Sequence, residues 1–239
     1  MRRSLLMIIA FAIGCAAHEK LPPVAWHSDT EALRILADRA SQIRTVSAQG
    51  SLTMERPDGQ SVRLDLAMVR DHEHHVRLRA WKLGRAVFDF TMTLDGIWML
   101  LPDDPTIRDR MRESQAPITR LADTFDVLDG ALFSRPDVQT RESGNTLICS
   151  ATVNGAPVRC EVDKLTLAPR RYVISDDHGV VRFTMDLSNY RVIDDIPFAC
   201  KYAAVSDMGR ITISLDDVEL NSDLAPAAFT PPKRAEKVR

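Results

Sequence analysis

Residues 76–101 read VRLRAWKLGRAVFDFTMTLDGIWMLL, and this stretch decides the fold class. Its first part is a strict alternation, in which Val76, Leu78 and Ala80 take turns with Arg77, Arg79 and Trp81. A period of two places the apolar side chains on one face of a strand and the polar ones on the other. Asp95-Gly96 then marks a tight hairpin. The pattern predicts antiparallel strands with one buried and one wet face.

The same alternation recurs along most of the chain. It is clear at residues 62–69, 181–188 and 211–216. Turn signals separate the runs, at Pro57-Asp58-Gly59, Asn154-Gly155 and His178-Gly179. We therefore predict a mainly β (α+β) fold, in which about eleven strands form one long antiparallel sheet curled into an open half-barrel.

Two helical segments interrupt the strands. Ser28-Asp29-Thr30-Glu31 is a capping-box pattern, and the helix after it carries apolar residues at helical spacing and should end near Thr45. Residues 103–136 also show helical spacing, with a face made of Ile118, Leu121, Ala122, Phe125, Leu128 and Leu132. We expect the N-terminal helix and this mid-chain helical insert to cover the apolar side of the sheet. An apolar cavity would remain where they fill it incompletely.

The N-terminus has the form of an export signal. Arg2 and Arg3 precede an apolar run over residues 5–13, which is too short for a stable membrane-spanning helix. Ala12-Ile13-Gly14-Cys15 resembles the lipobox of bacterial lipoproteins. That resemblance implies cleavage before Cys15 and a covalent diacylglycerol and N-acyl lipid on this cysteine, which would anchor the chain in a membrane.

Cleavage before Cys15 divides the chain into four parts: a signal peptide (1–14), the lipidated cysteine and tether (15–28), a half-barrel domain (29–232) and a charged tail (233–239). We expect an extended tether, because Pro22-Pro23 blocks a helix, and a disordered tail. Ala16 after the cysteine favours the outer over the inner membrane in Gram-negative sorting. An ordinary secreted protein, cut after Ala17, is the alternative to lipidation.

Composition excludes some partners. The net charge of −2 argues against nucleic acid, which needs a basic face. No second apolar run approaches the roughly 20 residues of a membrane helix. Membrane contact should therefore come through Cys15 or through surface loops.

Cys149 and Cys160 flank the Asn154-Gly155 turn at equal distances. In such a hairpin they face each other at a hydrogen-bonded position, where Cα atoms lie about 5.5 Å apart and a disulfide can form. Export permits this disulfide, and two reduced core cysteines are the alternative. Cys200 has no evident partner.

Candidates for chemistry are weak. One cluster could bind a metal ion: His72, Glu73, His74 and His75. It lacks the HExxH spacing, so a solvated turn explains it better, and we expect no metal site. Adjacent carboxylates, as in Asp194-Asp195, point to opposite faces of a strand. Neither a GxSxG elbow nor a phosphate-binding glycine loop is present. We expect neither catalysis nor a cofactor.

Three segments resemble the LolA/LolB family of periplasmic lipoprotein carriers and receptors. They are 36–52 (LADRASQIRTVSAQGSL), 76–101 and 196–232, the last ending in LDDVELNSDLAPAAFTPP. Together with the strand order they extend over most of residues 29–232. The resemblance implies an open β half-barrel closed by helices around an apolar cavity that accepts lipoprotein acyl chains.

In LolB the connection between the third and fourth strands protrudes and presents a leucine to the membrane. The matching positions here are Trp81, Lys82, Leu83 and Gly84. The flanking strands nearly meet there, so we expect no long loop. Trp81 and Leu83, with Lys82 and Arg85 beside them, would suit an interface of apolar tails and anionic head groups. A tight hairpin whose Trp81 covers the outer face of the sheet is the alternative.

Two functions remain open. The first is an anchored protein of the cell envelope, facing the periplasm, that receives or passes lipoprotein acyl chains or another hydrophobic ligand, with a periplasmic carrier as a candidate partner. The second is an anchored structural or regulatory module, like half-barrels of sigma-factor regulators, that has a filled core and binds a protein. A continuous apolar void above about 300 Å³ would favour the first, and a packed interior the second.

Overall fold

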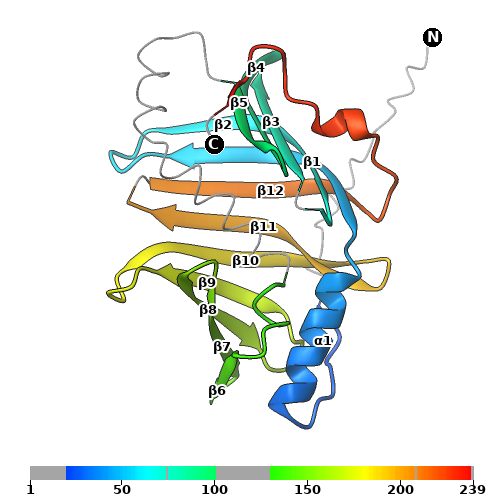
Figure 1. Ribbon diagram of the computed structural model, residues 1–239, viewed down its shortest axis with the longest axis vertical. Helices are drawn as coiled ribbons and strands as arrows, with labels where there is room; N and C mark the ends of the chain where they lie inside the picture. The colour runs from blue at the N-terminus through cyan, green and yellow to red at the C-terminus, as the bar shows by residue number, and fades with distance from the viewer. Residues whose placement is uncertain (1–19, 74, 101–129, 208, 238–239) are drawn as a thin grey trace, which may run out of the picture.

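The computed structural model describes residues 20–73, 75–100, 130–207 and 209–237. Within these residues thirteen strands form one antiparallel sheet, in the order β13-β5-β4-β3-β2-β1-β12-β11-β10-β9-β8-β7-β6 (Figure 1). Their bounds are β1 Thr45–Glu55, β2 Ser61–Asp71, β3 Val76–Lys82, β4 Arg85–Thr93, β5 Gly96–Leu100, β6 Gln139–Ser143, β7 Thr146–Val153, β8 Ala156–Asp163, β9 Pro169–Ser175, β10 Val181–Ile193, β11 Ile196–Ser206, β12 Gly209–Leu220 and β13 Glu236–Lys237.

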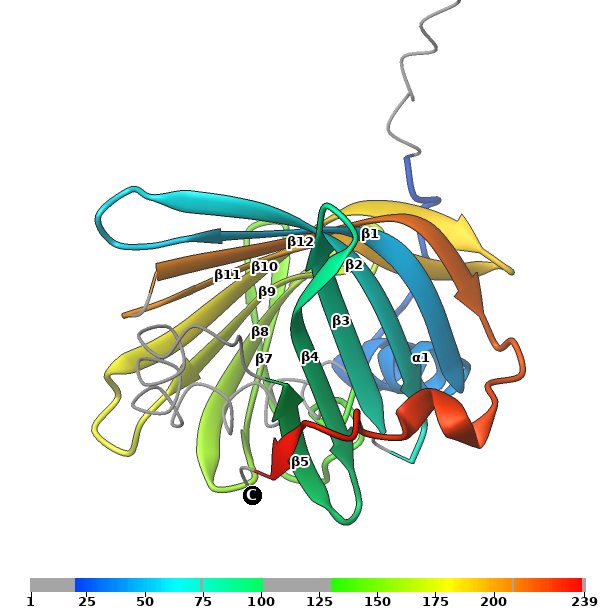
Figure 2. The ribbon, with the colours of Figure 1, turned by 90° about the horizontal axis from the view of Figure 1, so that it is seen from above.

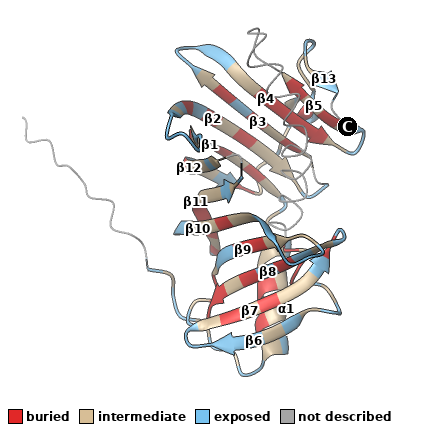
Figure 3. Cartoon of the chain, turned by 90° about the vertical axis from the view of Figure 1, so that its left-hand side faces the viewer, coloured by how far each residue is buried: buried red, intermediate tan, exposed pale blue. Residues whose placement is uncertain are grey.

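The sheet curls into an arch (Figure 2), and its edge strands, β13 and β6, lie at opposite ends and do not meet (Figure 3). The predicted open half-barrel is therefore confirmed. The sheet has thirteen strands rather than about eleven. The pairing of Glu236 and Lys237 with Met99 and Trp98 of β5 corrects the expectation that the charged tail is disordered.

The predicted N-terminal helix forms, but it ends at Ser41 rather than near Thr45, which is the first residue of β1. Helix α1 spans Asp29–Ser41 and lies inside the arch (Figure 2). The hydroxyl of Ser28 accepts a hydrogen bond from the Glu31 amide at 3.2 Å, and the Glu31 carboxylate accepts one from the His27 amide at 2.7 Å. These two bonds satisfy amides at the start of the helix that no backbone carbonyl reaches.

Most of the expected mid-chain helical insert lies outside the described residues. Of its apolar face only Leu132 is described, and this residue is fully buried in a turn rather than in a helix. The short 3-10 helix η1, Pro226–Phe229, follows the last long strand. In the described part of the chain no helix has the length and apolar character that crossing a membrane requires.

The tether is docked over part of its length. The Val24 amide donates to the Leu165 carbonyl at 2.8 Å, and the Trp26 indole donates to the Lys164 carbonyl at 2.9 Å. Both side chains pack against the core beneath α1. The segment expected to be an extended tether is therefore bound to the domain from Val24 onward.

Two apolar cores divide the sheet between them, and Figure 3 shows buried residues along the strands of both halves. One joins β1–β5 to β11 and β12, and includes Leu64, Leu66 and Phe90. The other lies between α1 and β7–β10, and includes Leu36 and Tyr172. The face of the sheet that α1 covers is therefore the inner, apolar face of the arch.

Candidate functional site

Apolar side chains form continuous rows across the inner face. In an antiparallel pair, residues directly opposite each other point to the same side of the sheet. The first row is Val62, Met54, Ile211, Ala204 and Met185, each paired with the next across β2, β1, β12, β11 and β10. The second row is Leu64, Leu52, Ile213, Tyr202 and Leu187 on the same five strands.

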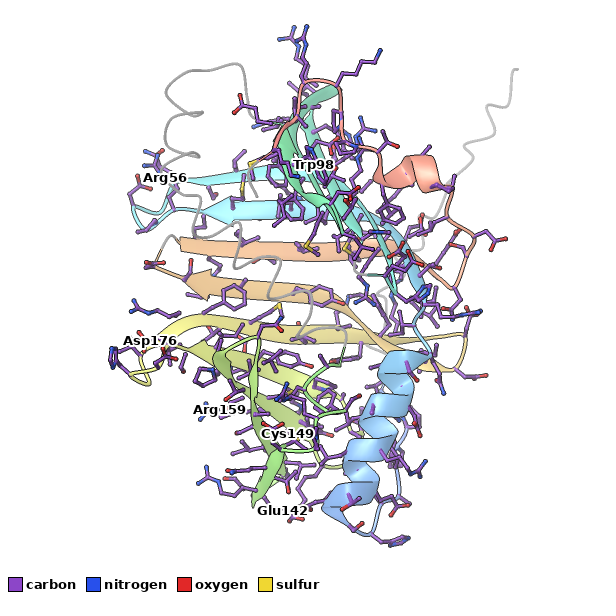
Figure 4. The ribbon with its side chains drawn as sticks, viewed as in Figure 1. Arg56, Trp98, Glu142, Cys149, Arg159 and Asp176 are labelled. Carbon is purple, nitrogen blue, oxygen red and sulfur yellow. The ribbon has the colours of Figure 1, made fainter. Side chains whose placement is uncertain are left out.

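The two rows differ in burial on β1 and β2, whereas on β10 Met185 of the first row is buried and Leu187 of the second is half-buried. Leu52 and Leu64 of the second row are nearly inaccessible to solvent, whereas Met54, Val62 and Ile211 of the first are half-buried. The first row lies next to the turns that join β1 to β2 and β11 to β12. Arg56 and Asp176 mark two hairpin tips on this side of the arch (Figure 4). The accessible end of the apolar face is therefore at this rim.

One cation belongs to the same face. Arg70 follows Leu64, Leu66 and Met68 at two-residue steps along β2. Burial lowers the pKa of its guanidinium, and nearby Tyr202 and then Asp71 act in the opposite direction. An arginine keeps its charge through shifts of this kind. The face therefore combines extended apolar rows with the half-buried positive charge of Arg70.

A hollow of about 380 Å³ lies where the tether crosses the sheet. Its walls are Leu21, Thr166, Ala168, Arg170, Asp186, Leu187 and Tyr190. It is open, and two of these residues are charged. It is therefore not the continuous apolar void expected of a carrier.

The β3–β4 connection is a two-residue turn. Lys82 pairs with Arg85, and Leu83 and Gly84 between them have φ angles of 51° and 76°. Leu83 is 93% exposed, the highest value among the large apolar side chains of the described residues. Trp81 is half-buried and pairs with Asp65 on the outer face. The tight hairpin thus has the predicted length, and contact of Trp81, Leu83 and Gly84 with a membrane stays a prediction.

Cys149 and Cys160 are directly paired, as the hairpin register predicts. Both are fully buried free thiols in the structure. Burial raises the pKa of Cys149 to about 12 and that of Cys160 well above its ordinary value. A disulfide between them stays a prediction. Cys200 accepts a hydrogen bond from the Arg191 guanidinium at 2.9 Å.

The residues after β2 form a turn organised by Asp71. Its carboxylate accepts hydrogen bonds from the backbone amides of Glu73 and His75 at 2.9 and 3.0 Å. The same carboxylate lies 2.8 Å from Nδ1 of His75. Candidate ligand atoms of these three side chains lie within 4.8 Å of one another. The hydrogen bonds account for this cluster as a turn, and the expected absence of a metal stays a prediction.

Some residues of the candidate site escape sequence reasoning. The alternation placed Val62 and Ile211 each on an apolar face of a strand. It did not show that they lie in one row, because both pair with Met54 and their strands, β2 and β12, are far apart in the sequence. The docking of Val24 and Trp26 was missed for the same reason. Only long-range pairing reveals either arrangement.

Similar solved structures support this fold. No protein-family model matches the chain, and no curated protein matches its sequence. A DUF1329 family protein from Desulfovibrio piger aligns with a TM-score of 0.61 at 15% identity, over 85% of this chain and 98% of that one. A protein from Vibrio parahaemolyticus, described as an outer membrane lipoprotein-sorting domain, aligns at 0.57 and 13% identity, over 82% and 95%. A LolA superfamily protein from Nitrosomonas europaea aligns at 0.54 and 10% identity, over 83% and 97%.

At these identities the likeness concerns the fold alone. The chain has the open half-barrel of LolA-like proteins, as its resemblance to that family implied. The coverage of nearly the whole of each neighbour shows that the likeness extends over the full half-barrel rather than one hairpin.

Proposed function

We propose that this chain is a lipid-anchored protein of the cell envelope, facing the periplasm, that receives acyl chains of lipoproteins or another hydrophobic ligand on its inner face. One observation carries the proposal: the half-buried side chains of Met54, Val62 and Ile211 lie directly beside the second apolar row, in which Leu52 and Leu64 are buried. An acyl chain that entered there would meet apolar side chains on five neighbouring strands. The proposed role is binding, not catalysis.

Apolar burial would supply the driving force. Each methylene removed from water contributes about 0.8 kcal/mol, so a dozen buried methylenes would contribute roughly 10 kcal/mol before the costs of association. The flexible thioether of Met54 can adapt to chains of different shape. A receptor that passes its ligand on requires only moderate affinity, which a partly open face provides.

The proposed anchor on Cys15 would hold the half-barrel near a bilayer. Val24 is hydrogen-bonded to Leu165, and eight residues, 16–23, separate it from Cys15. At 3.3–3.6 Å per residue this stretch reaches at most about 29 Å. Ala16 supports the outer membrane. Leu83, with Trp81 and Gly84 beside it, is the proposed second membrane contact, and a periplasmic carrier that delivers the ligand is a candidate partner.

The test places a charge in the row. Full-length lipidated protein is purified in detergent, examined by native mass spectrometry for co-purified lipid, and titrated with a fluorescent fatty acid. M54E/I211E should weaken fatty-acid binding by about tenfold or more, because the chain would displace water from carboxylates. The matched control is T53E/T212E, which changes the neighbouring pair on the outer face of the same two strands.

The two variants decide between outcomes. Equal binding by wild type and M54E/I211E would refute an acyl site at this rim. Equal loss in both variants would indicate a general effect on folding, which urea denaturation of each would reveal.

A second function is favoured by the packing at the far end of the face. Leu64, Leu66 and Phe90 are each at most 2% exposed, as in a filled core. This packing favours an anchored regulatory or structural module that binds a protein partner. Such a module would show no co-purified lipid in native mass spectrometry and would not bind the fatty acid.

A further inference from the structure

The C-terminal segment is held firmly at its first half. After β12 the chain passes through η1 and runs on to β5 (Figure 2). The Arg77 guanidinium donates one hydrogen bond to the Ala228 carbonyl at 3.1 Å and two to the buried carboxylate of Asp89. The ring of Phe229, which is buried, lies 5.4 Å from that of His75. These contacts fix η1 beside the start of β3.

The same segment is held weakly at its far end. Strand β13 is two residues long, and both Glu236 and Lys237 are exposed. Glu236 pairs with Met99, Lys237 pairs with Trp98, and the Lys237 ammonium lies 5.3 Å from the centre of the Trp98 ring. Exposed chain ends with few buried contacts open locally at little cost in free energy. We therefore expect β13 to leave β5 without displacing η1.

Strand β5 has an apolar sequence for a position so near the end of the sheet. It reads GIWML, with Ile97 and Met99 buried and Trp98 and Leu100 half-buried. An apolar strand whose backbone groups are open on one side readily accepts another strand. Among the described residues β13 pairs with two of the five residues of β5, at the end of the arch (Figure 3). The edge of β5 is therefore longer than the strand that covers it.

The side chains of β13 match only one of the two residues that they face. Residues directly opposite each other point to the same side of a sheet. Lys237 suits Trp98, because the face of an indole ring attracts a cation. Glu236 is opposite Met99, which is 1% exposed and belongs to the apolar core. An aliphatic side chain at that position would extend the core, which a carboxylate cannot do.

We propose that the edge of β5 is a docking site for an extended segment of a protein partner, and that β13 occupies this edge until the partner binds. The partner segment runs antiparallel to β5, with lysine or arginine opposite Trp98 and an aliphatic residue opposite Met99. Main-chain hydrogen bonds give affinity to a strand added in this way, and alternate side chains give selectivity. The site requires neither the lipid anchor nor the rows of the inner face, so the proposal goes beyond acyl binding.

The test uses a synthetic peptide as the partner segment. Its sequence is TPPKRAVKVR, which is residues 230–239 with Glu236→Val. Fluorescence anisotropy of the labelled peptide measures its binding to full-length protein in detergent. E236P/K237P in the protein removes both backbone N–H groups of β13 and so weakens its pairing. This variant should bind the peptide at least about fivefold more tightly than wild type does, because the internal competitor is displaced.

A matched protein variant and a second peptide complete the comparison. Lys233→Pro places proline in the same exposed segment, at the second position of the turn that the Ala235 amide closes on the Pro232 carbonyl. Proline is favoured there, so this variant should bind the peptide as wild type does. The peptide TPPKRAVEVR, which also carries Lys237→Glu, should bind at least about fivefold more weakly, because the cation over Trp98 is lost.

Two results would overturn the proposal at once: equal affinity of wild type and E236P/K237P for the first peptide, or equal affinity of one protein for both peptides. Light scattering adds a third. If E236P/K237P dimerised and did not bind the peptide, the occupant of the edge would be a second copy of this chain and not a partner protein.

The outcome is independent of the acyl-binding assay. E236P/K237P should bind the fluorescent fatty acid as wild type does, because β13 contributes nothing to the two apolar rows. Absence of peptide binding with intact fatty-acid binding would overturn this inference alone. Selective peptide binding by a wild-type protein that does not bind fatty acid would overturn the acyl-receiving function alone.

Discussion

Gly50 of β1 lies so close to Ser214 of β12 that a Cβ atom on it would be 2.0 Å from the Ser214 carbonyl oxygen. The contact is at a β-bulge, where the β1–β12 register shifts between Gln49 and Gly50. Bulges bend and twist a strand locally. The arch therefore depends here on a residue with no side chain, at the centre of the inner face.

Gly50→Ala should destabilise the protein by about 3 kcal/mol or more, because two backbones would have to separate. Urea denaturation followed by circular dichroism measures the loss. Gln49→Ala, at the exposed neighbouring position, is the control and should change the free energy of unfolding by less than about 0.5 kcal/mol. Equal effects of the two variants would contradict the proposed role of the bulge.

Alkaline pH should unfold the reduced protein. Burial raises the pKa of Cys149 to about 12, and raises those of Cys160, Tyr172 and Tyr190 well above their ordinary values. Because the unfolded chain loses these protons first, stability is intact below about pH 9 and falls as pH rises through the folded-state pKa values. Thermal denaturation between pH 8 and 12 in reducing agent, as chosen conditions, measures this, and Cys149→Ser should make the decline shallower.

The alternation of apolar and polar residues predicted most of the strands. The strands that it did not predict were missed for a physical reason. Residues 139–143 (QTRES) form β6 although four of the five are exposed, so no alternation marks them. Their strand exists because β7 supplies the hydrogen bonds. Likewise β13 consists of two exposed charged residues. It is a strand because it pairs with β5, which its own sequence does not indicate.

The candidate site divides in the same way. The exposed Leu83 and the facing cysteines follow from local turn chemistry, which sequence reveals. The rows of the inner face require the pairing of β1 with β12, which joins the two ends of the domain. Local patterns tell which side chains are apolar, and only the topology tells which of them form one surface.

Trp26→Ala should release the tether. The indole donates to the Lys164 carbonyl, and the Lys164 ammonium lies 5.9 Å from the centre of its ring. Loss of this half-buried side chain should cost about 2 kcal/mol of stability and expose residues 20–27 to proteases. Limited proteolysis with N-terminal sequencing measures the release. His27→Ala, which keeps the indole, should leave the cleavage rate near that of wild type, and a wild-type rate in Trp26→Ala would contradict docking.

Leu83→Asn should stabilise the hairpin while weakening its contact with membranes. Leu83-Gly84 has φ angles of 51° and 76°, and Asn154-Gly155 has 50° and 82° in the β7–β8 hairpin. Left-handed backbone costs a leucine about 1–2 kcal/mol, which asparagine partly avoids, so the melting temperature should rise by a few degrees. In anionic vesicles the variant should dissociate faster, because the exposed apolar tip is gone.

The reciprocal change tests the reason. Asn154→Leu places leucine at the same position of the other hairpin and should lower the melting temperature by at least as much as Leu83→Asn raises it. If Leu83→Asn instead destabilised the protein, the leucine would contribute to folding and not only to contact. A gain in stability with a loss of membrane contact would mean that Leu83 is kept at the expense of the fold, as is common at functional positions.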